Sequence, residues 1–110
     1  MRAEAAYRAV RHHWKGHSFA YEVKCGNVLL DIVIDNSIAI EVKSDMDDVV
    51  RGIADLAIAR AHGYAYAVLV TSKRQAFRLD RRVFEAYGFG LAYAADRGKS
   101  LVWVIKPEGL

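Results

Sequence analysis

The sequence predicts an α/β domain in which helices flank a central mixed β-sheet. Two neighbouring apolar runs, residues 28–34 and 37–43, are typical of adjacent buried strands. A helical pattern over 47–63 is followed at once by another apolar run at 66–71. A strand, a helix and a strand in close succession imply a right-handed crossover and a parallel strand pair. We therefore expect the element order α-β-β-β-α-β-α-β-β.

Length and composition favour one globular domain over residues 1–110. Hydrophobic residues make up 54% of the chain and charged residues 26%. No apolar run approaches the ~20 residues that cross a bilayer, and the first 15 residues are too polar for a signal peptide. We expect a cytoplasmic protein without a membrane partner. Cys25 is the only cysteine, which excludes an internal disulfide and a four-cysteine zinc site.

The first two elements are predicted to be a helix and an edge strand. The helix covers residues 3–15, and Gly16 ends it. Its apolar face consists of residues at helical spacing: Ala3, Ala6, Tyr7, Val10 and Trp14. Residues 18–24 then alternate between apolar and polar side chains, which is typical of a half-exposed strand at a sheet edge.

Residues 47–63 form the clearest predicted helix. Asp47 and Asp48 suit its N-terminus, because carboxylates cap the first turn and interact favourably with the helix dipole. Gly63 ends the helix. The spacing predicts an apolar stripe that faces the sheet and consists of Val50, Ile53, Ala54, Ala57 and Ala61.

The last third of the chain combines a basic segment with a helix and a hairpin. Residues 73–82 hold five basic side chains against one acid, in a chain whose net charge is +3. Local basic surface fits a polyanion partner, although a solvated face explains most such runs. A short helix is predicted over 80–87, and strands at 90–94 and 101–105 form the closing hairpin.

Charged residues interrupt the two most apolar strands. Asp31 lies in the first, and Glu41 and Lys43 lie at the end of the second. A two-residue turn would set Asp31 opposite Ile40, whereas a three-residue loop over 35–37 would set it directly opposite Glu41. We favour the three-residue loop, because it gathers the three charged residues on one face. The other face is then wholly aliphatic, with Ile32, Ile34, Ile38 and Ile40.

This register predicts a metal site. Two carboxylates at ~5 Å repel one another, and one of them protonates unless a cation lies between them. Lys43 supplies one positive charge, and a divalent ion would supply more. Hard carboxylate oxygens suit Mg²⁺, with Mn²⁺ as a substitute.

These residues give the chain a resemblance to the PD-(D/E)xK nuclease superfamily, and within it to the small archaeal Holliday junction resolvases. The family places an Asp at the end of one strand and an acid-x-Lys at the end of the next, as in "LLDIVI" and "IAIEVK" here. The segment "GIADLAIARAHGYAYAVLV" and the closing "YGFGLAYAADRGKSLVWVIKP" are also similar to the family, so the likeness covers nearly the whole chain. Leu30 stands in place of the Pro of the family name, and Asp55 stands where many relatives have Gln.

The resemblance implies a restriction-endonuclease-like sheet and metal-dependent hydrolysis of DNA phosphodiester bonds. Asp31, Glu41 and the backbone carbonyl of Val42 would bind Mg²⁺, which would polarise the phosphate and supply hydroxide. Lys43 would orient or deprotonate the attacking water, and Glu4 would assist from the first helix. The phosphate backbone would be held by a set of basic residues: Arg8, Arg11, Lys15, Lys73 and Arg74. Resolvases of this kind act in DNA recombination and repair as symmetric homodimers.

Plainer explanations exist for each residue taken alone. Asp31 could be a strand-end carboxylate bound to a backbone group, and Glu41 with Lys43 could be a surface ion pair. Only the combination of these three residues favours catalysis. For Glu4, an ion pair with Arg8 is as good an explanation as catalysis. Asp55 reads as a solvated helix residue rather than a ligand.

Two functions of different class therefore remain open. The first is an active Mg²⁺-dependent endonuclease, selective for branched or otherwise structured DNA. The second is a catalytically silent DNA-binding or assembly module that retains the fold; a nuclease subunit of a larger repair or viral complex is a further alternative. The presence of all three core residues favours activity. The sequence does not distinguish a four-way junction from a flap, a single strand or a plain duplex.

Overall fold

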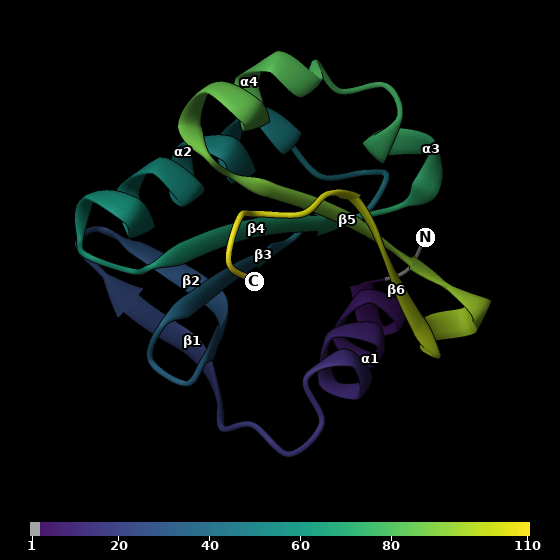
Figure 1. Cartoon of the computed structure of the whole chain (residues 1–110), viewed down its shortest axis with the longest axis horizontal. Coiled ribbons are helices and arrows are strands. Elements are labelled where there is room, and N and C mark those ends of the chain that lie inside the picture. The colour runs from purple at the N-terminus through teal and green to yellow at the C-terminus, as the bar shows by residue number, and fades with distance from the viewer. Residues whose placement is uncertain (1–2) are drawn as a thin grey trace.

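Six strands form one mixed sheet with helices on both of its faces in the computed structural model, which describes residues 3–110 (Figure 1). The strands are β1 (Phe19–Cys25), β2 (Val28–Ile34), β3 (Ile38–Val42), β4 (Tyr66–Thr71), β5 (Gly90–Ala95) and β6 (Ser100–Ile105). The helices are α1 (Ala3–His13), α2 (Val49–Ala61), α3 (Lys73–Ala76) and α4 (Arg81–Tyr87), with a single 3₁₀ turn, η1 (Asp96–Gly98). The predicted α/β class is confirmed.

The strands lie in the sheet in the order in which they occur in the chain. β1–β2, β2–β3 and β5–β6 are antiparallel, whereas β3–β4 and β4–β5 are parallel. This confirms the parallel pair predicted across the central helix and the edge position predicted for β1. Consecutive strands are neighbours throughout, so every connection is local.

The predicted order lacks one short helix, α3. Ser72 begins it, since its hydroxyl oxygen accepts a hydrogen bond from the Gln75 N–H at 3.2 Å. Such a cap satisfies a backbone donor that a helix otherwise leaves open. A single turn is too short to produce a recognisable apolar period, which is why the basic segment did not predict it.

The helices divide between the two faces of the sheet. Ala6 and Val10 of α1, with Trp14 just after it, pack against the isoleucines of β2 and β3 on one face. Leu56 of α2 packs with residues of α3 and α4 on the other face. Figure 1 shows the same separation, with α1 on one side of the strands and α2, α3 and α4 together on the other. The predicted face of α1 is confirmed except for Ala3, which is exposed.

The apolar stripe predicted for α2 is wrong except at Ile53, which packs against the core. Val50 is 75% exposed, and the three alanines of that stripe are also exposed. The buried residues of the helix are instead Gly52, Asp55, Leu56 and Ala59. An added Cβ at Gly52 would lie 3.0 Å from Lys43 Cε and 3.3 Å from Leu69 Cδ1, so this glycine lets α2 approach the sheet closely. Close approach at Gly52 turns a different face of the helix toward the strands.

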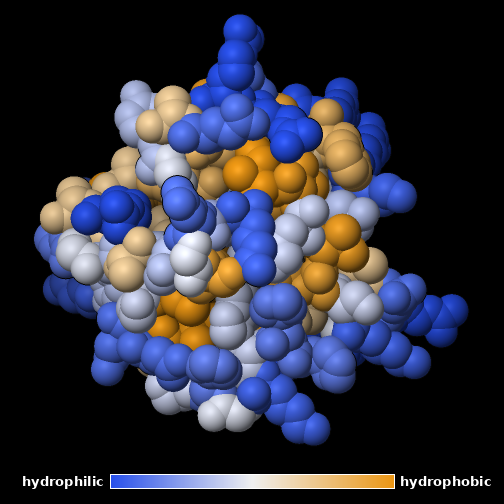
Figure 2. Space-filling view, viewed as in Figure 1, coloured by the Kyte–Doolittle hydropathy of each residue, from blue (hydrophilic) through white to orange (hydrophobic). Residues whose placement is uncertain are grey.

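Polar side chains project around the outline of the molecule, with apolar patches between them on the face in view (Figure 2). No helix within residues 3–110 is long and apolar enough to cross a bilayer.

Candidate functional site

The hairpin between β2 and β3 adopts the three-residue register. Ile34 pairs with Ile38 and Ile32 with Ile40, leaving residues 35–37 as the loop. The four isoleucines lie together in the aliphatic cluster beneath α1. The favoured register is thereby confirmed, and continuing it by one step sets Asp31 opposite Glu41.

The two acids each bind the backbone of the opposite strand. The Asp31 N–H donates to Glu41 Oε1 at 3.3 Å, and the Val42 N–H donates to Asp31 Oδ2 at 2.7 Å. Glu41 is 2% exposed, and Asp31 is half-buried. The carboxylates therefore satisfy backbone donors at the point where the regular strand pairing of β2 and β3 stops.

An irregularity on the neighbouring strand accompanies this arrangement. The pairing of β1 with β2 runs through Tyr21–Ile32, omits the next position and resumes at Val23–Leu30. Glu22, which lies at the omitted position, has a left-handed backbone with φ of 51°. Side chains two residues apart in a strand normally point to the same face. Leu30, however, packs with a cluster that includes Ala59 of α2, whereas Ile32 packs with the cluster beneath α1. The alternation of faces along β2 is therefore interrupted here.

A cavity of about 530 Å³ opens beside the acid pair. Asp31, Glu41 and Lys43 line it from the strands, and Asp48, Arg51 and Asp55 line it from α2 and its cap. The Lys43 side chain lies against Gly52, where α2 approaches the sheet closely. The three residues predicted from the strands thus share one water-accessible space.

Negative charge accumulates at the acid pair. The pKa of Glu41 is raised to about 8, first because the carboxyl is buried and then because Asp31 and Asp55 lie nearby. Burial also raises the pKa of Asp31, although its hydrogen bond from Val42 and the Lys43 ammonium oppose this. The single lysine does not compensate for the acids around it. A cation beside them would favour their ionised forms.

The interpretation of Asp55 as a solvated residue is wrong. It is 8% exposed on the inner face of α2, and its charge acts on both Asp31 and Glu41. The helix faces the sheet through Gly52 and Leu56, which places Asp55 on the same side as the cavity. Sequence spacing signals this face, because residues 52, 55, 56 and 59 also follow a helical period.

Tyr7 is a further residue close to the acids. Burial, followed by the nearby charges of Asp31 and Glu41, raises its pKa to about 12. The sequence placed Tyr7 on the apolar face of α1 and gave it no functional role. Its phenol is a polar group on a helix that covers the opposite face of the sheet.

The remaining predicted residues are dispersed. Glu4 is exposed on the first turn of α1 and does not line the cavity. Arg8, Arg11 and Lys15 are exposed on or just after α1, and Arg8 Nη1 donates to the Arg97 carbonyl at 2.8 Å. These three come from the helix on the face of the sheet away from α2.

The second basic group lies on a helix that is hydrogen-bonded to the segment after Lys43. Lys73 and Arg74 are exposed on α3. Gln75 of that helix donates through Nε2 to the Ser44 carbonyl at 3.2 Å, directly after Lys43. The structure therefore ties α3 to the end of the strand that carries Glu41 and Lys43.

The donor set suits a hard cation, although it is not a complete ligand cage. Within residues 3–110, no group of three or more acidic, histidine or cysteine side chains is arranged to hold a metal ion. Asp31 and Glu41 provide carboxylate oxygens whose pKa values are raised first by burial and then by neighbouring acids. Two carboxylates with several water ligands are a common way to hold Mg²⁺.

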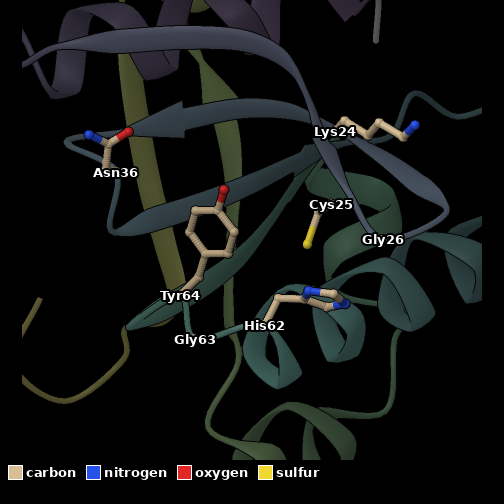
Figure 3. Close-up of a pocket in the computed structure, with 7 residues that line it drawn as sticks. All are labelled: Lys24, Cys25, Gly26, Asn36, His62, Gly63 and Tyr64. Atoms are coloured by element: carbon tan, nitrogen blue, oxygen red, sulfur yellow. The ribbon is translucent and has the colours of Figure 1, made fainter.

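A second hollow, of about 280 Å³, lies elsewhere and has a different character. In Figure 3 the Cys25 sulfur points toward the His62 ring, whereas Lys24 and Asn36 point away from it. Its lining contains no acidic side chain. The acid pair and Lys43 are therefore confined to the cavity beside α2.

Comparisons with protein-family models, with curated proteins and with solved structures found no match for this chain.

Proposed function

We propose that this protein is a metal-dependent DNA endonuclease of the PD-(D/E)xK type, with the restriction-endonuclease-like fold of that superfamily. The observation that carries the proposal is the hairpin register. It places Asp31 beside Glu41, and both line one cavity with Lys43. A protein that needed only stability would fill this space with apolar side chains, since buried unpaired carboxylates are costly.

Asp31, Glu41 and the Val42 carbonyl would hold Mg²⁺ or Mn²⁺. When bound, the ion supplies positive charge for the phosphate and for the attacking water. Its charge would also keep Glu41 ionised near neutral pH, against the burial that otherwise favours the protonated form.

Lys43 is the group placed to act on the substrate. Its stem packs over Gly52, which limits the positions that the ammonium can occupy. From the cavity, the ammonium can orient the attacking water and stabilise the charge that develops on the phosphate. Asp55 adds negative charge near Glu41, and a bound cation would offset this charge.

Exposed basic residues would hold the phosphate backbone of DNA. Lys73 and Arg74 are attached to the site through α3 and Gln75. Arg8, Arg11 and Lys15 would contact a more distant part of a branched substrate. Glu4 remains a candidate for assistance from α1. Such contacts provide affinity with little sequence preference. A homodimer would present two equivalent sites, as two equivalent strands of a DNA junction require.

The test is cleavage of end-labelled four-way junction, flap, duplex and single-stranded DNA with Mg²⁺, with Mn²⁺ and with EDTA. We expect metal-dependent cleavage that Glu41→Gln and Lys43→Ala each reduce by at least about 100-fold, which is a typical loss for an essential catalytic group. The matched controls are Glu85→Gln and Lys24→Ala, which make the same chemical changes at exposed positions outside the cavity.

A second readout does not depend on activity. Mg²⁺ should raise the melting temperature of the wild-type protein but not that of Asp31→Asn or Glu41→Gln, because a ligand stabilises only a state that binds it. If DNA is bound without cleavage and neither substitution has an effect, the chain is a DNA-binding module on a nuclease-like fold.

A further inference from the structure

The two edges of the sheet are protected to different degrees. β1 has charged, exposed residues at Glu22 and Lys24, and its pairing is broken at Glu22, where φ is 51°. β6 reads "SLVWVI", with no charged residue and no proline, and all six residues are partly exposed. Charges and backbone irregularities are the usual devices that prevent an edge strand from pairing with another chain. β6 lacks charges along its whole length.

The irregularity that β6 has is confined to its last residues. Pairing with β5 is regular from Ser100 to Trp103, and one extra residue follows at Val104 before the Leu91–Ile105 pair. Arg81 Nη2 donates to the Val104 carbonyl at 3.3 Å. The open part of this edge is therefore residues 100–103.

We propose that β6, through residues 101–103, pairs antiparallel with the same segment of a second copy of this chain. Two antiparallel strands related by two-fold symmetry have their axis perpendicular to the sheet, so one edge can pair with itself. In an antiparallel pair, residues opposite one another point to the same face of the sheet. The two-fold axis must therefore pass between one residue and its own copy in the second chain. An uncharged strand also has no charge pattern that would select a different partner.

The axis passes through Val102. In this register Leu101 lies opposite Trp103 of the partner subunit, and Val102 lies opposite its own copy. Lys99 then faces Ile105 of the partner subunit, so no two lysines are opposed. An axis through Leu101 would set Lys99 against the partner's Trp103. An axis through Trp103 would set Val102 against the irregular Val104 of the partner subunit, which in the Val102 register meets only Ser100 at the end of the pairing. Among the regular residues 100–103, the Val102 register therefore gives the greatest number of apolar cross-strand pairs, which are the units that stabilise a sheet.

This inference identifies the surface of the homodimer in the proposed function, and it rests on that homodimer but not on hydrolysis. The experiment is the solution mass of the metal-free protein by light scattering over a wide concentration range. The wild-type protein should have twice the mass of one chain. Val102→Lys would place two ammonium groups directly opposite one another, and we expect it to weaken the dimer by about ten-fold or more.

Two matched variants complete the test. Ala20→Lys adds the same charge to an exposed position of the β1 edge and should leave the dimer intact. Val102→Thr keeps the β-branched shape without charge and should also remain dimeric. Circular dichroism confirms that each variant folds. In addition, Val102→Cys should form a covalent dimer under a mild oxidant, whereas Ala20→Cys should not, because only opposed residues bring two Cβ atoms within disulfide range.

A wild-type protein that is monomeric at every concentration would overturn the proposal. A dimer that Ala20→Lys disrupts and Val102→Lys does not would assign the interface to β1 instead. Cleavage activity decides neither outcome, and loss of cleavage with an intact β6 dimer would count against the nuclease alone.

Discussion

The two faces of the central sheet are built from the same strands but differ in composition. The face beneath α1 is aliphatic, and Ile32, Ile34, Ile38 and Ile40 are all buried there. The face beneath α2 carries Glu41 and Lys43, opposite Gly52 and Asp55 of the helix. Hydrophobic spacing predicted both helices, but it identified the buried face only of α1 and failed to identify that of α2. The buried face of a helix can be predicted from apolar spacing when that face consists of apolar residues alone.

The largest expected effect is a loss of stability on the α1 face. Ile40 is fully buried, and Ile40→Ala should lower the free energy of unfolding by about 3 kcal/mol, because it removes buried methyl groups and leaves a cavity. Val50→Ala is the control, since Val50 was predicted to be buried but is 75% exposed. It should change stability by less than about 0.5 kcal/mol. Urea unfolding measures both, and equal losses would contradict the assignment of the α2 face.

The α2 face should make stability depend on pH in the absence of metal. The pKa of Glu41 is raised from its ordinary value of 4.5 to about 8. The folded protein therefore holds this proton more tightly than the unfolded chain does. The resulting stabilisation is complete below about pH 4.5 and is lost as the pH rises toward about 8, with a total of a few kcal/mol.

Urea unfolding across this pH range, with EDTA present, measures the dependence. Glu41→Gln should flatten much of the profile, and Asp31, whose pKa is raised in the same direction, should account for part of the remainder. Glu85→Gln is the matched control on the surface. A wild-type profile that matches Glu41→Gln would show that folding does not raise the pKa of Glu41.

A smaller effect on stability than that of Ile40→Ala is expected from Gly52→Ala. The new Cβ would lie 3.0 Å from Lys43 Cε and 3.1 Å from Lys43 Cγ, so the lysine must move. Alanine favours a helix by about 1 kcal/mol over glycine, which offsets this crowding. We therefore expect a net change in stability within about 1 kcal/mol but a clear loss of DNA cleavage.

Ala57→Gly, at an exposed position of the same helix, provides the converse control. It should cost about 1 kcal/mol of stability and leave cleavage unchanged. Normal cleavage by Gly52→Ala would show that the position of Lys43 above this glycine has no part in the reaction.

Much of the fold was predictable because its signals are local. The hairpin register followed from the rule that one face of β2 and β3 must be free of charge, and the pairing of Ile32 with Ile40 confirms it. The parallel pair across α2 followed from the order of the elements. The short helix α3 had no such signal, because one turn is too short to show a period.

The sequence by itself determined the strands, their succession along the chain and the hairpin register that sets Asp31 opposite Glu41, since each depends on the local pattern of neighbouring residues. Only the tertiary structure decided which face of α2 meets the sheet, and with it the burial of Asp55. It also brought Tyr7 of α1 near the acids. These outcomes depend on close approach at Gly52 and on charges that act through space between distant elements. The hydrophobic period of a single segment indicates neither of these two effects.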